Sequence, residues 1–151
     1  MSLNDNIFIL KQVLRALEYI HAHHIIHRDL KPHNIVIKLD DKSVKLVDFG
    51  LSLLYDNNTE LKRFMRCGTM GYIAPEIVNN SEMNRKKYDT KSDMFGLGII
   101  AHMLLMGTNP IRGKHYDDTV NKNIKCNFTL DKKQILLRYG SACYDLLSAL
   151  L

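Results

Sequence analysis

The side chains best suited to chemistry lie close together at residues 27–34. Within these eight residues the chain carries a fixed cation, a carboxylate, an ammonium group and a carboxamide, which belong to Arg28, Asp29, Lys31 and Asn34. Apolar residues flank the stretch on both sides, and such runs are typical of short buried strands. The pattern predicts a rigid polar loop held between two strands, and loops of this kind often carry catalytic or binding groups.

Two further motifs follow this loop. The loop reads H-R-D-L-K-P-H-N, and after it come D-F-G at 48–50 and A-P-E at 74–76. A lone H-R-D triplet is weak, because it recurs by chance and an aspartate before Leu-Lys-Pro can simply start a turn. All three motifs in this order and spacing form a specific signature. In them the chain resembles the eukaryotic protein kinases of the serine/threonine type.

The resemblance implies transfer of the γ-phosphoryl group of ATP to a serine or threonine hydroxyl of a protein substrate. Asp29 would accept the proton of that hydroxyl. Lys31, two residues later, is typical of the serine/threonine subclass and would steady the charge of the transferring phosphoryl group. Thr69 would hydrogen-bond in the same cluster. In its overall sequence pattern the chain most resembles the calcium/calmodulin-dependent kinases.

The same resemblance implies a site for ATP and Mg²⁺. Short strands at 35–37 and 44–47, joined by a turn, predict a β-hairpin with Asn34 at one end and Asp48 at the other. In the family these two residues hold the magnesium ions that bridge the phosphates, and hard cations need such oxygen ligands. Val36 matches the position that forms the floor under the adenine, and it would also fit as an ordinary core valine.

The elements that position these groups are expected to be mainly helical. Apolar residues at helical spacing over 6–21 predict an amphipathic helix, with an N-cap at one of the residues 4–6. Its expected apolar stripe is Ile7, Leu10, Val13, Leu14, Ala16, Leu17 and Ile20.

A second predicted helix is apolar on every side and is therefore expected in the core. It would be capped by Asp89 or Thr90 and would run to Met106, where Gly107 offers a stop. In the resemblance this is the central helix of the large lobe, and its Asp93 would accept hydrogen bonds from the backbone of the catalytic loop. Without the resemblance, Asp93 would be a first-turn acid facing the helix dipole.

The expected fold is the protein-kinase-like fold, mainly α with a small β-hairpin, as one domain over residues 1–151. A hydrophobic content of 46% in 151 residues supports a single core. The resemblance covers the large C-terminal lobe. The chain contains neither a G-x-G-x-x-G loop nor a lysine in a V-A-I-K context, and the usual last helices are missing. We therefore expect a partial kinase domain that is inactive alone.

Residues 51–73 show little periodicity and are expected to be a loop. They resemble part of an activation segment, in which Arg28 would pair with a phosphate. Only Thr59 would carry that phosphate, because 63–67 has no hydroxyl. The stretch at 67–73 is similar to the part that receives the substrate peptide.

Substrate selection is expected to be apolar rather than basic. The pocket for the residue after the acceptor would be lined by Met70 and Ile73 and should favour an apolar side chain. Two positions that commonly supply carboxylates for an upstream arginine match His33 and Met103, and neither is acidic. Arginine selection should therefore be weak, unless acids elsewhere, such as Glu60 or Asp117, supply the charge.

Composition excludes several other classes. The net charge of +5 comes from interleaved acids and bases, and the one dense basic run, at 85–87, is read as a solvated edge rather than a nucleic-acid site. The longest apolar run, at 94–106, is shorter than the about 20 residues of a membrane span. Three distant cysteines suit reduced thiols. We expect a soluble, cytoplasmic protein.

Some alternatives stay open at this point. A pseudokinase or scaffold would keep the fold for binding, although every catalytic position of the large lobe is intact. A small-molecule phosphotransferase of the antibiotic-kinase type would lack the segments at 68–69 and 74–76. The histidines at 21, 23, 24 and 27 would be able to share zinc, and Cys67 would be a redox-sensitive thiol if Arg66 lowered its pKa. The simpler interpretation is that His21 and His24 lie at a helix end and that His27 belongs to the catalytic loop. Cys67 is then a small apolar residue.

Overall fold

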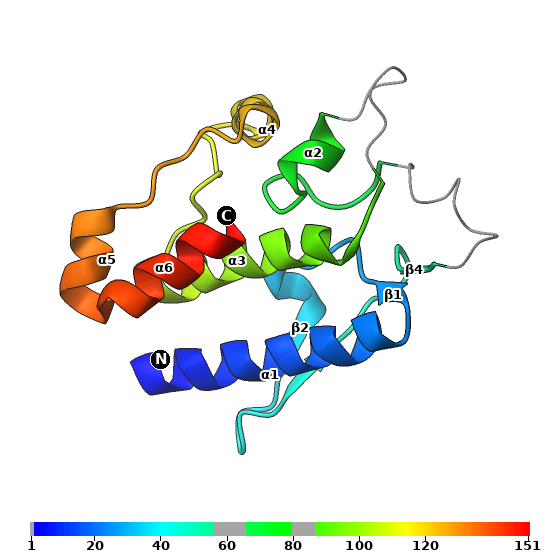
Figure 1. Ribbon diagram of the computed structural model, residues 1–151, viewed down its shortest axis with the longest axis horizontal. Coiled ribbons are helices and arrows are strands. Elements are labelled where there is room, and N and C mark those ends of the chain that lie inside the picture. The colour runs from blue at the N-terminus through cyan, green and yellow to red at the C-terminus, as the bar shows by residue number, and fades with distance from the viewer. Residues whose placement is uncertain (1, 56–65, 80–86) are drawn as a thin grey trace.

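The computed structural model describes residues 2–55, 66–79 and 87–151, and these form a mainly helical unit around two long helices (Figure 1). The elements, in chain order, are α1 (Leu3–Ala22), β1 (Ile25–Ile26), η1 (Pro32–Asn34), β2 (Ile35–Ile37), β3 (Val44–Leu46), β4 (Leu53–Leu54), α2 (Pro75–Val78), α3 (Thr90–Met106), α4 (Tyr116–Lys125), α5 (Lys132–Tyr139) and α6 (Ser141–Leu150). The predicted fold class, mainly α with a small β-hairpin, is confirmed.

Helix α1 begins earlier than the sequence pattern indicated. Ser2 is its N-cap: the Ser2 hydroxyl accepts a hydrogen bond from the Asp5 N–H at 3.2 Å, and the Asp5 carboxylate accepts one from the Ser2 N–H at 3.1 Å. This reciprocal pair is a capping box. The predicted N-cap within 4–6 was therefore wrong, because the box adds a turn before the apolar stripe starts.

The buried face of α1 is also rotated from the expected one. Ile9, Val13, Leu17 and Ile20 are buried, whereas Ile7 and Leu14 are 40% and 46% exposed. Apolar residues occupy several faces of this helix, so periodicity alone did not identify the face that packs against α3 and β3.

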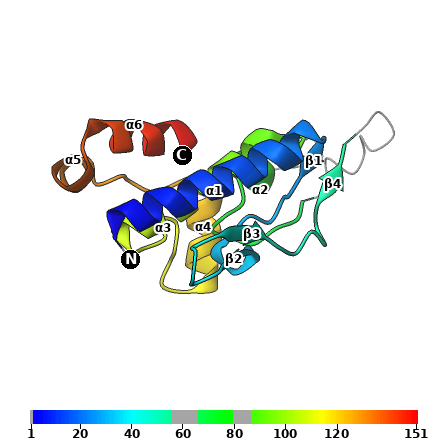
Figure 2. The ribbon, with the colours of Figure 1, turned by 90° about the horizontal axis from the view of Figure 1, so that it is seen from below.

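Helix α3 is buried on nearly all sides, as predicted. The Asp89 carboxylate caps its start by accepting the Lys91 N–H at 2.8 Å, and Gly107 ends it with a φ of 77°, a left-handed conformation that favours glycine. Helices α1 and α6 both pack against α3. Figure 2 shows α6 and the β2–β3 hairpin on opposite sides of this central pair.

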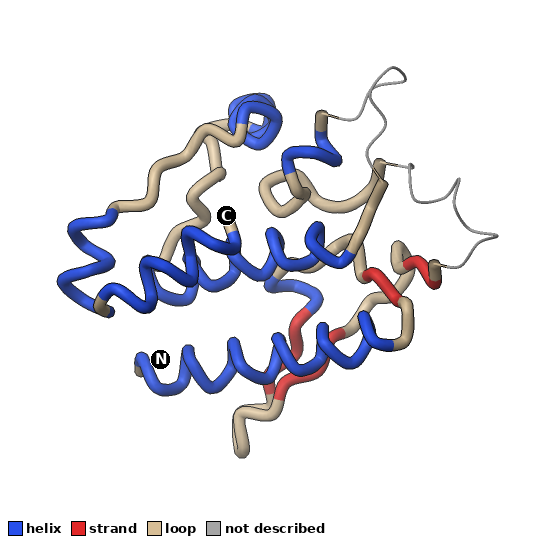
Figure 3. The backbone as a smooth tube through the Cα atoms, viewed as in Figure 1, coloured by secondary structure: helices blue, strands red, loops and turns tan. Residues whose placement is uncertain are grey.

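Two short strand pairs lie beside α1 (Figure 3). Strands β2 and β3 form the predicted hairpin, with Val36 opposite Lys45. Val36 is 50% exposed, so it is not a core valine of the described part of the chain. Strand β1 pairs with β4, and Leu53 of β4 is buried. The prediction of a loop from residue 51 onward was wrong here, because a two-residue strand is formed by its partner and not by a pattern of its own.

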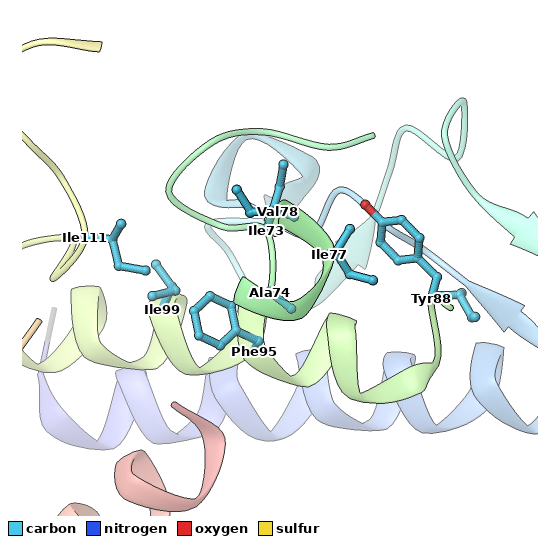
Figure 4. Packing of buried hydrophobic residues seen from close by; sticks show 9 residues of the cluster. Ile73, Ala74, Ile77, Val78, Tyr88, Phe95, Ile99 and Ile111 are labelled. Atoms are coloured by element: carbon cyan, nitrogen blue, oxygen red, sulfur yellow. The ribbon is translucent and has the colours of Figure 1, made fainter. Parts of the chain in front are cut away.

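A compact apolar cluster fixes the segment after residue 66. Figure 4 shows Ile73 and Ala74, then Ile77 and Val78 of α2, lying over Phe95 of α3. Helices α2 and α4 contact each other on the same side of α3. Within the described ranges, no helix is both long and apolar enough to cross a lipid bilayer.

Some predictions fall outside the described residues. They concern phosphorylation of Thr59, a specificity role for Glu60, and the basic edge at Arg85 and Lys86.

Candidate active site

The polar loop at 27–34 lies between β1 and β2, as the flanking apolar runs predicted. Although it carries charged and polar groups, it is largely buried: His27 is 0%, Asp29 6% and Asn34 4% exposed. Buried polar groups need partners, so the hydrogen bonds of this loop decide what each side chain is able to do.

Asp93 at the start of α3 holds the loop backbone. Its two carboxylate oxygens accept the N–H groups of His27 and Arg28, each at 2.9 Å, which confirms the predicted contact. Asp93 is 1% exposed, and His21 of α1 makes a third bond to it at 2.8 Å. Arg28 has a φ of 66°, a region that is costly for a non-glycine residue and is kept where surrounding bonds enforce it. The carboxylate of Asp93 supplies two of those bonds.

The Asp29 carboxylate is the centre of a second cluster. The Lys31 ammonium donates to Asp29 Oδ2 at 2.7 Å and to the Thr69 hydroxyl at 2.8 Å, and that hydroxyl donates to Asp29 Oδ1 at 2.7 Å. The Asn34 carboxamide donates to Asp29 Oδ2 at 3.2 Å and to the Asp29 carbonyl at 2.9 Å. The structure therefore brings together the four residues that were predicted to be catalytic.

The partners of Asp29 keep its side chain charged. Burial raises the pKa of this carboxyl, but the hydrogen bonds from Lys31 and Thr69, with the positive charge of Lys31, outweigh burial. The net effect is a pKa below the usual range of an aspartate. At neutral pH the group is a carboxylate that is able to accept a proton.

Asp48 follows the end of β3, next to the loop. The preceding residue ties the two together, because the Val47 N–H donates to the Asn34 carbonyl at 3.0 Å and the His27 ring bonds the Val47 carbonyl at 3.2 Å. Asp48 has a φ of 61° and is exposed, and its Oδ1 accepts the Gly50 N–H at 3.3 Å. The predicted hairpin thus brings the chain segments of Asn34 and Asp48 together.

These two residues suit a hard cation. Asp48 offers an exposed carboxylate, and the Asn34 carbonyl oxygen Oδ1 accepts no hydrogen bond from any described residue. Mg²⁺ takes oxygen ligands, commonly one or two from the protein, and completes its octahedron with water and phosphate. The donor set fits that requirement.

The four histidines near this loop contact separate groups rather than one centre; the ring of His24 lies edge-on to that of Tyr55, 5.3 Å between centres. His21 bonds Asp93, His23 bonds the Tyr19 carbonyl at 2.7 Å, and His27 bonds Val47. Over the described ranges, no three histidine, cysteine or acidic side chains gather as they would around a metal ion. The zinc interpretation therefore has no support in the geometry.

Tyr88 is a site residue that the sequence did not reveal. It is 1% exposed, its hydroxyl donates to the Cys67 carbonyl, and the Cys67 N–H donates back to it at 3.3 Å. Burial raises the pKa of this phenol.

The Arg28 guanidinium lies 5.4 Å from the centre of the Tyr88 ring and donates to the Leu51 carbonyl at 2.6 Å. Arg66 donates to the Val78 carbonyl at 3.4 Å, and so is not directed at the Cys67 thiol.

Asn123 of α4 is another residue without a sequence signal. It is 0% exposed; its Oδ1 accepts the Gly71 N–H at 2.7 Å and its Nδ2 donates to the Ile73 carbonyl at 2.8 Å. Asn109 donates to the Gly71 carbonyl at 3.2 Å. Gly71 has a φ of 88°, which favours glycine. The two asparagines therefore fix the stretch that follows Thr69.

A groove of about 710 Å³ opens beside these residues. His33, Met70 and Met103 line it, which places three predicted specificity residues together. Ile73, the other residue predicted for this pocket, does not line the groove; it is 5% exposed and belongs to the core cluster, against which Met70 also packs. A role for Ile73 in substrate selection therefore stays a prediction.

Comparison with known proteins agrees with this geometry. The family model described as "Protein kinase domain" matches residues 1–151. Calcium-dependent protein kinase 5 of Plasmodium berghei (strain Anka) is 42% identical over 125 residues, which are 82% of this chain and 21% of that protein. A probable serine/threonine-protein kinase 2 of Plasmodium falciparum is 38% identical over 126 residues, covering 82% and 23%.

A human relative gives a similar match. Myosin light chain kinase family member 4 of Homo sapiens is 36% identical over 134 residues, which are 86% of this chain and 32% of that protein. The chain thus spans about a fifth to a third of the length of these relatives, since the matched shares are 21%, 23% and 32%.

Proposed function

Because the chain belongs to the protein kinase family, we propose that it supplies the catalytic loop of a serine/threonine protein kinase, which transfers the γ-phosphoryl group of ATP to protein hydroxyls. One observation carries the proposal: Asp29, Lys31 and Thr69 form a closed hydrogen-bonded cluster, with all three contacts between 2.7 and 2.8 Å. A lobe that served only for binding would not need a buried carboxylate held in its charged form.

In this proposal Asp29 accepts the proton of the substrate hydroxyl. Its lowered pKa keeps it ionised, and its two oxygens are held by Lys31 and Thr69, so the carboxylate does not rotate away from the incoming hydroxyl. Lys31 also brings positive charge to the place where the phosphoryl group is transferred. Positioning and charge neutralisation are the main contributions that a protein makes to phosphoryl transfer.

Asn34 and Asp48 would hold Mg²⁺, and Lys31 and Val36 would contact ATP. The Asn34 carboxamide oxygen and the exposed Asp48 carboxylate are the oxygen ligands that support this assignment. Val36 offers the adenine a side chain that is 50% exposed. When bound, Mg-ATP supplies the phosphoryl group and neutralises its developing charge. A cytoplasmic location fits the three free thiols, Cys67, Cys126 and Cys143.

The substitution Asp29→Asn in the full-length protein that carries this chain tests the function. Asparagine keeps the shape of the side chain and removes the proton acceptor, so kcat should fall by about 100-fold or more. Asp145→Asn is the matched control, since Asp145 is an exposed acid on α6. Transfer from ³²P-labelled ATP to a protein substrate is measured. Activity that survives Asp29→Asn unchanged would favour the scaffold alternative.

A further inference from the structure

We propose that the groove beside the catalytic loop selects protein substrates that carry a negatively charged side chain, either Asp or Glu or a phosphorylated residue, within a few residues of the acceptor hydroxyl. This inference rests on the proposed function, because it assigns the substrate class of the same site. A lack of carboxylates alone would explain weak selection of arginine. The inference goes further, because it assigns a preference for negatively charged side chains.

Basic side chains surround the groove. Arg112, Lys114 and Lys122 line it together with His33, and none of the described residues that line it is acidic. Its volume of about 710 Å³ is large enough for several peptide side chains. Asp117 does not line the groove, so it does not supply the charge that an arginine-selecting kinase needs.

Two of these cations lack a protein counterion among the described residues. Arg112 and Lys114 are exposed, and no described carboxylate pairs with either side chain. Lys122 has a weak partner in Asp118, 3.7 Å away, and both side chains of this pair are more than a third exposed. A substrate carboxylate or phosphate would therefore meet cations that are still able to form charge-assisted hydrogen bonds.

Besides its weak pair with Lys122, Asp118 orders the loop at 112–114 through the backbone. Its carboxylate accepts the Lys114 N–H at 2.9 Å, and the Thr119 hydroxyl accepts the Gly113 N–H at 2.9 Å. The Lys122 ammonium donates to the Arg112 carbonyl at 3.4 Å. These bonds use the backbone of residues 112–114, so they fix the loop while its basic side chains stay exposed.

The groove lies beside residues that hold the Asp29 carboxylate. Met70 lines it and follows Thr69, whose hydroxyl bonds Asp29. His33 lines it from η1, next to Asn34, which also bonds Asp29. We therefore expect a peptide whose acceptor hydroxyl reaches Asp29 to place neighbouring side chains in the groove. There an acidic side chain gains attraction and an arginine meets like charge.

Direct binding to this chain is the first test. Fluorescein-labelled peptides with alanine at the acceptor position, and Asp, phosphoserine, Gln or Arg at neighbouring positions, are titrated while anisotropy is measured. We expect the Asp peptide to bind about threefold to tenfold tighter than the Gln peptide, as one or two exposed charge pairs allow. The phosphoserine peptide should bind tighter still, and added salt should reduce both preferences. Equal binding of all four peptides would overturn the proposal.

Matched variants locate the effect. Arg112→Ala with Lys114→Ala removes two groove cations and leaves the backbone bonds of the loop intact, so the acidic preference should disappear. Lys125→Ala removes an exposed charge from α4 outside the lining and should change nothing. Arg112→Glu with Lys114→Glu should shift the preference toward the Arg peptide. An equal loss in Lys125→Ala would show that only overall charge acts, and would overturn the assignment.

The full-length protein separates this inference from the proposed function. A positional peptide library measures kcat/KM with each residue around the acceptor, and Asp, Glu or phosphoserine should be selected. Phosphorylation that selects arginine or shows no charge preference overturns the inference but keeps the kinase function. Acid-selective binding without any phosphoryl transfer supports the groove and overturns the kinase function.

Discussion

The Thr69 hydroxyl shows how much one atom contributes to this site. It accepts a hydrogen bond from Lys31 and donates one to Asp29, so it links the cation to the carboxylate from a segment 40 residues further along the chain. Hydrogen bonds to charged groups are stronger than those between neutral groups. Loss of the Thr69 hydroxyl should therefore affect two other side chains, Lys31 and Asp29, each of which loses a hydrogen bond.

We expect Thr69→Ala to lower kcat/KM by about tenfold or more, and Thr69→Ser to stay near the wild type, because serine keeps the hydroxyl. The hydrogen bond from Thr69 is one of the causes that lower the pKa of Asp29. Its loss should raise that pKa, so the acid limb of the kcat/KM profile should move to higher pH. A pH profile of the three proteins checks this, and an unmoved limb in Thr69→Ala would contradict the assignment of Asp29 as the base.

Asp93 gives a prediction about stability. Each of its oxygens accepts one backbone N–H of the loop, and the side chain is 1% exposed. Asp93→Asn replaces one acceptor by a donor, which leaves a buried N–H without a partner at a cost of about 1–3 kcal/mol. Urea unfolding of Asp93→Asn against the exposed control Asp145→Asn measures the difference. Equal stability of the two variants would show that the loop does not depend on this anchor.

At the scale of elements, α4 holds the stretch at 71–73, which we propose receives the substrate peptide, through a single side chain. Asn123→Ala removes the partners of the Gly71 N–H and the Ile73 carbonyl, both buried. The variant should lose about 2 kcal/mol or more of stability and raise the KM for peptide more than the KM for ATP. Asn121→Ala, an exposed change on the same helix, is the control. A proportional change in both KM values would argue for a general loss of folding instead.

Helix α1 and the β2–β3 hairpin are joined at a polar contact that depends on pH. Lys42 bonds Asp5, and the side chain of Gln12 donates to the Lys42 carbonyl at 2.8 Å and accepts the Val44 N–H at 3.1 Å. The Lys42 hydrogen bond and the capping bonds of Ser2 lower the pKa of Asp5 from 3.8 to about 2. Because this pKa is depressed in the folded state, the stabilisation is complete above about pH 3.8 and is lost as pH falls toward about 2.

Urea unfolding followed by circular dichroism, at about four pH values between pH 5 and pH 2, checks this pH dependence of stability. Asp5→Asn should be less stable than the wild type at the upper end, and the difference should shrink as Asp5 becomes protonated. A constant difference across the range would mean that the charge of Asp5 plays no part.

At the scale of the whole molecule, two of the side chains proposed to contact Mg-ATP are open to solvent. Val36 is 50% exposed and Asp48 is exposed. A site that is open to solvent does not exclude water or orient phosphates well. The 151 residues alone should therefore bind Mg-ATP weakly and transfer no phosphate. Isothermal titration calorimetry that gave a micromolar Kd for the chain alone would contradict this prediction.

The sequence by itself determined the polar loop at 27–34, the hairpin beyond it and the central helix with Asp93. These features are local: motif spacing, apolar runs and cap residues act within a few positions, and the contacts inside the loop, such as Lys31 with Asp29, join residues only two apart. The sequence did not determine the start of α1 or its buried face, because several faces of that helix are apolar and packing selects one of them.

Only the tertiary structure decided which distant polar groups meet. His21 bonds Asp93 across 72 residues, and Asn123 reaches Gly71 across 52. A single polar residue on a helix carries no periodic signal, so it reads as surface until the chain folds over it. The charge of the groove has the same origin, because His33, Met70 and the cations at 112–122 come from separate segments that line one space only after folding.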